Sequence, residues 1–108
     1  MTDRELLEKA ARAAGIAPRE GEEMEIGEDK IVIYGNGHCT SWRPITDDGD
    51  ALRLAVRLDL LIMPYPLDKA IRVTRLDLPE FIERYTDDQL AATRRAIVRA
   101  AAAIGEQE

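Results

Sequence analysis

The chain has 108 residues, with 21 acidic and 15 basic side chains and a net charge of −6. This length predicts one domain over residues 1–108, large enough to bury a core without disulfides or metal. The acidic balance disfavours nucleic acid as a partner, and aromatic residues at 5% are too few for a base-stacking platform. The single cysteine, Cys39, excludes an internal disulfide and a zinc cluster.

The amino terminus predicts a location in the cell. Its first residues lead into an amphipathic helix instead of an apolar run, so no signal peptide is expected. No stretch approaches the roughly 20 apolar residues that a membrane span needs. We therefore expect a soluble, cytoplasmic protein that does not bind a membrane.

A helix is predicted at the start of the chain. Thr2 and Glu5 form a capping box, in which the threonine caps the helix and the glutamate reaches back to it. Apolar residues then recur at helical spacing, and Gly15 is a typical stop at a helix C-terminus.

Three strands are predicted next, in residues 23–26, 30–34 and 38–42. The first alternates polar with apolar side chains, and the second is rich in β-branched residues. Residues 35–37, Gly-Asn-Gly, tolerate positive φ and predict a hairpin turn. We expect the three strands to form an antiparallel meander.

Residues 42–56 link these strands to a second helix, predicted over residues 47–58. Thr46 or Asp47 can cap this helix, and the acidic side chains that follow lie at the positive end of its macrodipole. Trp42, the only tryptophan, is expected to pack where the strand ends and the helix begins.

Two more strands are predicted in residues 60–63 and 69–74, which are expected to pair with each other. Pro64 and Pro66 restrict the first of them to a sheet edge or a bulge, because proline cannot donate to the ladder. Residues 76–85 are compatible with a short helix or an irregular excursion.

The last predicted helix follows a capping box at residues 86–89 and is rich in alanine. Small side chains let backbones approach closely, so we expect it to pack on a sheet face and to end at Gly105. Together the elements predict an α+β fold. Its expected form is a three-layer α/β/α sandwich, with helices on both sides of a mostly antiparallel sheet and three main helices.

Three stretches of the sequence, residues 1–7, 42–56 and 91–105, resemble small phage and prophage proteins of unknown function that carry the phage ABA sandwich domain. Two features depart from that family. Family members often have Asn where this chain has Arg43, and residues 63–85 do not match the family's pattern. The resemblance implies a three-layer α/β/α domain, encoded by a phage or prophage and expressed inside a bacterial cell. It implies no activity, substrate or cofactor.

The candidate binding residues lie in the two longest of these stretches: Trp42, Arg43, Asp47, Asp48, Asp50, Arg94 and Arg95. Two interpretations are open for the arginines, to which Arg99 is added. Their planar guanidinium groups suit phosphate. Alternatively, they pair with the acidic cluster across the helices, and we favour this internal pairing.

No residue set demands catalysis. His38 and Cys39 are neighbours in a predicted strand, so their side chains point to opposite faces. The acidic cluster lacks the alternating oxygen ligands and the distant Glu of an EF-hand loop. Residues 35–37 lack the spacing and the Lys-Ser/Thr of a Walker motif. We predict no catalytic residue, no metal site and no cofactor.

The leading hypothesis is a phage or prophage accessory protein that is not an enzyme and binds a protein of the host or the phage. The alternative is a structural or morphogenesis component that self-associates as a homo-oligomer near Pro64 or through an exposed helix face. A third hypothesis, an enzyme or small-ligand binder, would be favoured by a convergent polar pocket beside Trp42.

Overall fold

The computed structural model describes residues 1–107. Its elements in chain order are α1 (Asp3–Ala14), β1 (Glu22–Ile26), β2 (Ile31–Gly35), β3 (His38–Trp42), α2 (Asp48–Arg57), β4 (Leu61–Tyr65), the 3₁₀ turn η1 (Pro66–Asp68), β5 (Ala70–Thr74), β6 (Phe81–Arg84) and α3 (Gln89–Glu106). The strand pairings are all antiparallel. An α+β class with three main helices is therefore confirmed.

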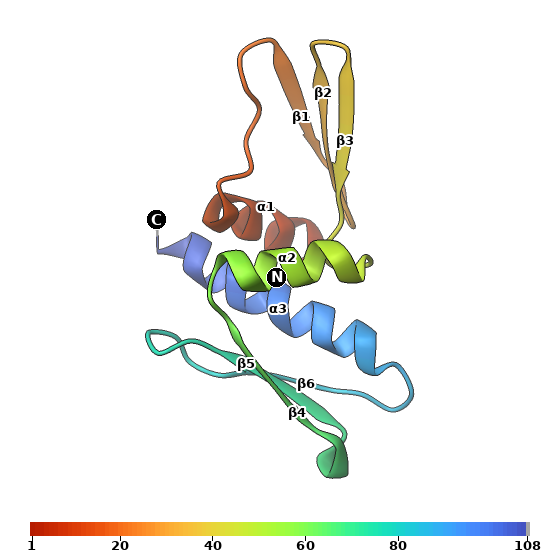
Figure 1. Cartoon of the computed structure of the whole chain (residues 1–108), viewed down its shortest axis with the longest axis vertical. Coiled ribbons are helices and arrows are strands. Elements are labelled where there is room, and N and C mark those ends of the chain that lie inside the picture. The colour runs from red at the N-terminus through yellow and green to blue at the C-terminus, as the bar shows by residue number, and fades with distance from the viewer. Residues whose placement is uncertain (108) are drawn as a thin grey trace.

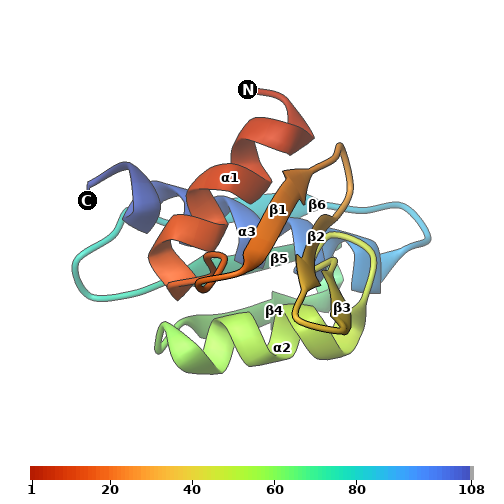
Figure 2. The same cartoon turned by 90° about the horizontal axis from the view of Figure 1, so that it is seen from above.

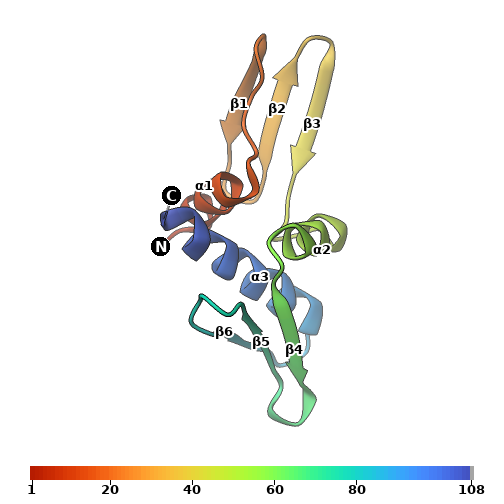
Figure 3. The same cartoon turned by 60° about the vertical axis from the view of Figure 1, so that its left-hand side comes forward.

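The strands form two separate sheets, β1-β2-β3 and β4-β5-β6, instead of one. Figures 1 and 3 show the helices between them, with the first sheet projecting from one side and the second sheet lying on the other. The molecule is elongated, with extents of 49 × 29 × 24 Å. The predicted single sheet with helices on both faces is wrong, because α2 carries the chain across the helical layer instead of back to the first sheet.

The first sheet stands on the helices by one end. Seen from above, it rises between α1 and α2 (Figure 2). Ile31 pairs with both Ile26 and Trp42 in one row, and it is fully buried against Leu7 and Ala11 of α1. Four of the five residues of β3 are exposed. The meander was predicted correctly, but its strands carry too few apolar residues to bury a whole face.

The second sheet packs on α3 through its central strand. Ile71 and Val73 of β5 are 2% and 0% exposed and belong to the same core as the alanines of α3. β4 is an edge strand, as Pro64 predicts. Residues 81–84 form β6, so the expectation of a helix or an irregular excursion was wrong for them, whereas residues 76–80 are irregular as one alternative had it. Glu83 occupies a half-buried position of β6 where a strand normally has an apolar residue. Because Glu83 is charged, the sequence does not show the alternation of polar and apolar residues that predicts a strand.

Two of the three helix starts follow the predicted caps, at Thr2 for α1 and Asp47 for α2. Helix α3 is capped by Asp88 instead of Thr86, so the capping box predicted at residues 86–89 is wrong. The side chains of Thr2, Asp47 and Asp88 accept hydrogen bonds from backbone N–H groups in the first turns of α1, α2 and α3, at 3.2, 2.8 and 2.9 Å. Gly15 ends α1 in the left-handed region, with a φ of 71°. The ends at Thr2, Asp47 and Gly15 could be predicted because each depends on a single side chain and its neighbours.

Gly105 lies inside α3 and does not end it, so the predicted stop was wrong. It marks the point where α3 meets α1: an added Cβ would lie 2.7 Å from the carbonyl carbon of Lys9 and would overlap the carbonyl oxygen. Next to this contact, the Lys9 ammonium pairs with the Glu106 carboxylate. The alanine-rich helix therefore packs on a helix as well as on the predicted sheet face.

This contact predicts that Gly105→Ala destabilises the protein by about 2 kcal/mol or more, because backbone atoms must move apart to admit the methyl group. The measurement is the free energy of unfolding in urea. Gly49→Ala is the matched control in α2, where the nearest atoms belong to the side chains of Arg53 and Asp47. Alanine favours a helix, so this variant should be unchanged or stabilised by up to about 1 kcal/mol. Equal stability of the two variants would contradict the proposed role of Gly105.

Candidate functional site

The acidic cluster at the start of α2 is bonded within the protein. Asp47 caps the helix, and Asp50 accepts a hydrogen bond from the backbone N–H of Arg43 at 3.0 Å. Asp50 also pairs with Arg53 at 2.6 Å. The Arg43 side chain itself is exposed. These contacts fix the loop before α2 onto the helix, which is a structural role.

Arg94 joins this cluster to α3. Its Nη1 lies 2.6 Å from Asp48 Oδ1, and its Nε donates to the carbonyl oxygen of Ile45 at 2.8 Å. The Arg94 side chain is only 16% exposed, whereas that of Asp48 is 60% exposed. The favoured internal pairing is therefore confirmed for Arg94, across 46 residues of sequence.

Arg95 and Arg99 pair elsewhere, so the same prediction was wrong for them. Arg95 lies 2.8 Å from Asp3 at the start of α1, and the hydrogen bond from Arg95 to Asp3 raises the pKa of the guanidinium. Arg99 pairs with Glu83 of β6, which Arg95 also approaches at 3.9 Å. These pairs tie α3 to α1 and β6. They occupy the guanidinium groups with carboxylates, which counts against the phosphate interpretation.

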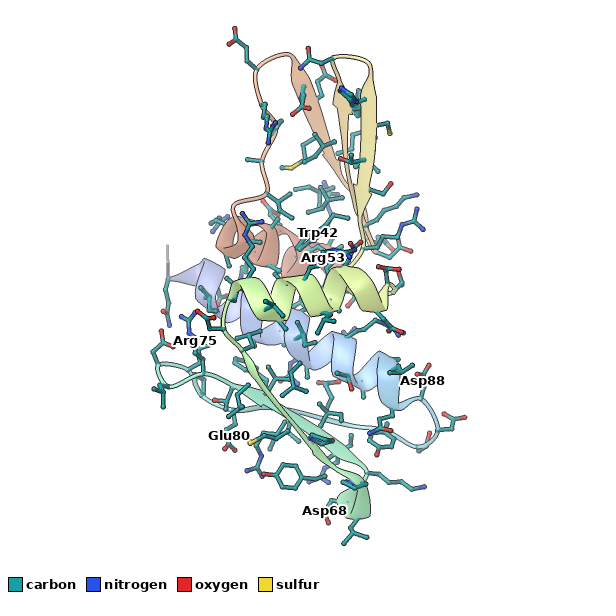
Figure 4. All side chains as sticks on the ribbon, in the orientation of Figure 1. Trp42, Arg53, Asp68, Arg75, Glu80 and Asp88 are labelled. Atoms are coloured by element: carbon teal, nitrogen blue, oxygen red, sulfur yellow. The ribbon has the colours of Figure 1, made fainter. Side chains whose placement is uncertain are left out.

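Trp42 lies at the foot of the first sheet, above α2 (Figure 4). It is half-buried and packs against the core of α1 and the first sheet as well as the larger core of the three helices. The expected packing at the junction of strand and helix is confirmed. Its exposed part lines a cleft, which is described below.

His38 and Cys39 do not converge on a catalytic arrangement. His38 and Cys39 are both exposed, and they pair with successive residues of β2, which places their side chains on opposite faces. In the part of the chain that the structure describes, no three His, Cys, Asp or Glu side chains are grouped to hold a metal ion.

The outer face of the first sheet carries a tyrosine beside two carboxylates. The Tyr34 hydroxyl donates to Glu23 at 2.8 Å and lies 3.2 Å from Glu25. The hydrogen bond to Glu23 is the main reason that the pKa of Tyr34 rises to about 12, and the two negative charges add to it. Tyr34 therefore stays protonated at neutral pH and acts as a hydrogen-bond donor.

An apolar surface is the feature that sequence reasoning missed. It is formed by Leu52 and Val56 of α2, Leu61 and Ile62 of β4, and Leu90 of α3, and it is called the α2–β4 groove here. Leu52, Val56, Leu61 and Leu90 are 58%, 68%, 55% and 59% exposed. Two hollows of about 510 and 210 Å³ share Leu52 and Ile62 within it. The signal was present, because Leu52 and Val56 lie four residues apart beside the buried face of α2.

The fold and this surface define a small α+β domain with two antiparallel sheets and one open apolar groove. Among residues 1–107, no helix is both long and apolar enough to cross a membrane. Comparison with protein-family models, with curated proteins and with solved structures finds no match to the chain.

Arg94→Met is predicted to destabilise the protein by about 1–3 kcal/mol, because it leaves the Ile45 carbonyl and Asp48 without their cationic donor. The measurement is again the free energy of unfolding in urea. Arg43→Met is the matched control, since that side chain forms no ion pair or hydrogen bond within residues 1–107. It should stay within about 0.5 kcal/mol of the wild type. An unchanged free energy of unfolding for Arg94→Met would show that the Arg94–Asp48 pair contributes nothing to stability.

Proposed function

We propose that this protein is a protein-binding module without enzymatic activity, encoded by a phage or prophage and acting inside the bacterial host. The α2–β4 groove is the observation that carries the proposal. Singly exposed leucines are ordinary on protein surfaces, but a contiguous apolar patch with hollows indicates an interaction site. The phage setting is supported by the resemblance of residues 42–56 to the phage ABA sandwich proteins.

The groove fits an extended segment of a partner protein. β4 is hydrogen-bonded to β5 on one side only, so its other side can accept a further strand. The apolar half of β4 is Leu61 to Met63, whereas Pro64 and Pro66 remove N–H donors beyond it. Alternate apolar side chains of an added strand would enter the two hollows beside Leu52.

Charge around the groove defines the partner further. Asp59 lines one hollow, and Asp48 lines the other, where Arg94 already pairs with it. The whole chain carries a charge of −6. We therefore assign the groove to an extended apolar segment flanked by Lys or Arg. Complementary charge of this kind raises the rate of association and helps to exclude acidic partners.

A self-associating structural component is the alternative, and the same edge supports it. Two copies of β4 related by a twofold axis would pair antiparallel and bring their exposed leucines together. The acidic residues at the groove disfavour this arrangement, because like charges would face each other across the interface.

The test is selection of 12-residue peptides from a random library on the immobilised protein. Enriched peptides should alternate apolar residues and carry basic flanks. Their affinity should fall at least tenfold for Leu61→Glu and for Val56→Glu, because each buries a charge in an apolar contact. Amide hydrogen exchange should slow at Leu61 to Met63 in the complex.

Leu67→Glu and Leu76→Glu are matched controls, since these leucines are 99% and 108% exposed and lie outside the groove. Both should bind the selected peptides as the wild type does. Equal binding by Leu61→Glu would overturn the assignment of the groove. A dimer of the protein alone that Leu61→Glu dissociates, detected by sedimentation, would favour the self-associating component instead.

A further inference from the structure

A further hollow lies where the first sheet meets the helices, and the inference drawn from it does not depend on the function proposed for the groove. It is a cleft of about 570 Å³ between the loop after α1, the inner face of β2 and β3, and the C-terminal end of α2. This volume is within the range of small-molecule sites. Ile33 and Trp42 supply an apolar part, and Arg19, Arg57, His38 and Glu22 supply a polar part.

The two arginines of this cleft are not neutralised. Among the described residues, neither Arg19 nor Arg57 forms an ion pair, although the chain has 21 acidic residues. By contrast, Arg53, one turn before Arg57, pairs with Asp50 at 2.6 Å. Unpaired guanidinium groups beside apolar side chains are donors that suit an anion.

Arg57 has an evident local contact. One of its guanidinium nitrogens lies 3.9 Å from the position of a Cβ on Gly15, at the C-terminal end of α1. The partial negative charge of the helix end attracts the guanidinium toward this side of the cleft. A helix end carries only about half an elementary charge, so it does not fully neutralise the positive charge of Arg57.

The charges in the cleft define the ligand. Arg19 and Arg57 contribute +2 and Glu22 contributes −1, so the lining carries +1 with His38 neutral. The Glu22 carboxylate accepts the backbone N–H of Arg19 at 2.8 Å, which fixes the loop that carries the arginine. A ligand with one negative charge brings the net charge of the cleft to zero. A dianion would leave a net charge of −1 and would be repelled more strongly by the Glu22 carboxylate.

We propose that this cleft binds a small organic monocarboxylate with an aromatic or apolar body. The carboxylate accepts hydrogen bonds from Arg57 and Arg19, and the body packs against Ile33 and the exposed part of Trp42. His38 and Thr40 of β3 offer further polar contacts at the rim.

Trp42 reports on this cleft directly, because it is the only tryptophan of the chain. The experiment titrates the full-length protein with phenylacetate and follows tryptophan fluorescence excited at wavelengths that the ligand does not absorb. A saturable change is expected. Phenylacetamide, the neutral analogue, and phenyl phosphate, a dianion, should each bind about tenfold more weakly than phenylacetate.

Arg57→Gln and Arg19→Gln test the two cations separately. Each should weaken phenylacetate binding about tenfold or more, the loss expected for one charge-assisted hydrogen bond. Arg53→Gln is the matched control on the same helix face and should bind as the wild type does, because Arg53 does not line the cleft. Unchanged melting temperatures would show that the variants are folded.

Three results would overturn the proposal. The first is the absence of a saturable fluorescence change with phenylacetate in the folded wild-type protein. The second is binding that Arg57→Gln and Arg19→Gln leave intact, since it would locate the ligand elsewhere. The third is tighter binding of phenyl phosphate or phenylacetamide, which would reject a monocarboxylate site. None of these results bears on the α2–β4 groove.

Discussion

The close contact of α3 with α1 at Gly105 is the constraint on which the rest of the structure depends. Because the helices touch there without a side chain between them, the alanines of α3 can pack against α1 on one side and β5 on the other. Helix α2 and the second sheet share one core with α1 and α3, whereas the first sheet packs on a smaller cluster beside α1. The contact at Gly105 therefore fixes the distance between α1 and α3 within the helical layer.

Charged side chains near the helix ends complete this arrangement. Asp48 with Arg94 fixes the start of α2 to α3, and Asp3 with Arg95 fixes the start of α1 to the same helix. These aspartates and arginines are therefore explained largely by their place in the fold. The two surfaces for which binding is proposed lie elsewhere, in the apolar groove beside β4 and in the cleft beneath the first sheet.

Local features could be predicted from the sequence, and long-range arrangement could not. The caps at Thr2 and Asp47, the first meander and the edge position of β4 each depend on a few neighbouring residues. The division into two sheets depends on how α2 crosses the helices, and β6 depends on Glu83 finding a cationic partner in α3. The candidate sites differ in the same way. The pairing of Arg94 with the acidic cluster was predicted correctly. The cleft could not be predicted, because it joins residues from three separate segments that have no shared motif.

Helix α2 has a further consequence, because its opposite flanks line both surfaces. Leu52 and Val56 face the groove, and Arg57 reaches the cleft at its end. The helix is ten residues long and is fixed at its start by Asp47 and Asp48. A ligand that shifts α2 from one side therefore changes the free energy of binding on the other. Thermodynamic linkage requires any such coupling to be reciprocal: if binding in the cleft displaced α2, a molecule in the cleft and a polypeptide in the groove would alter each other's affinity by the same factor.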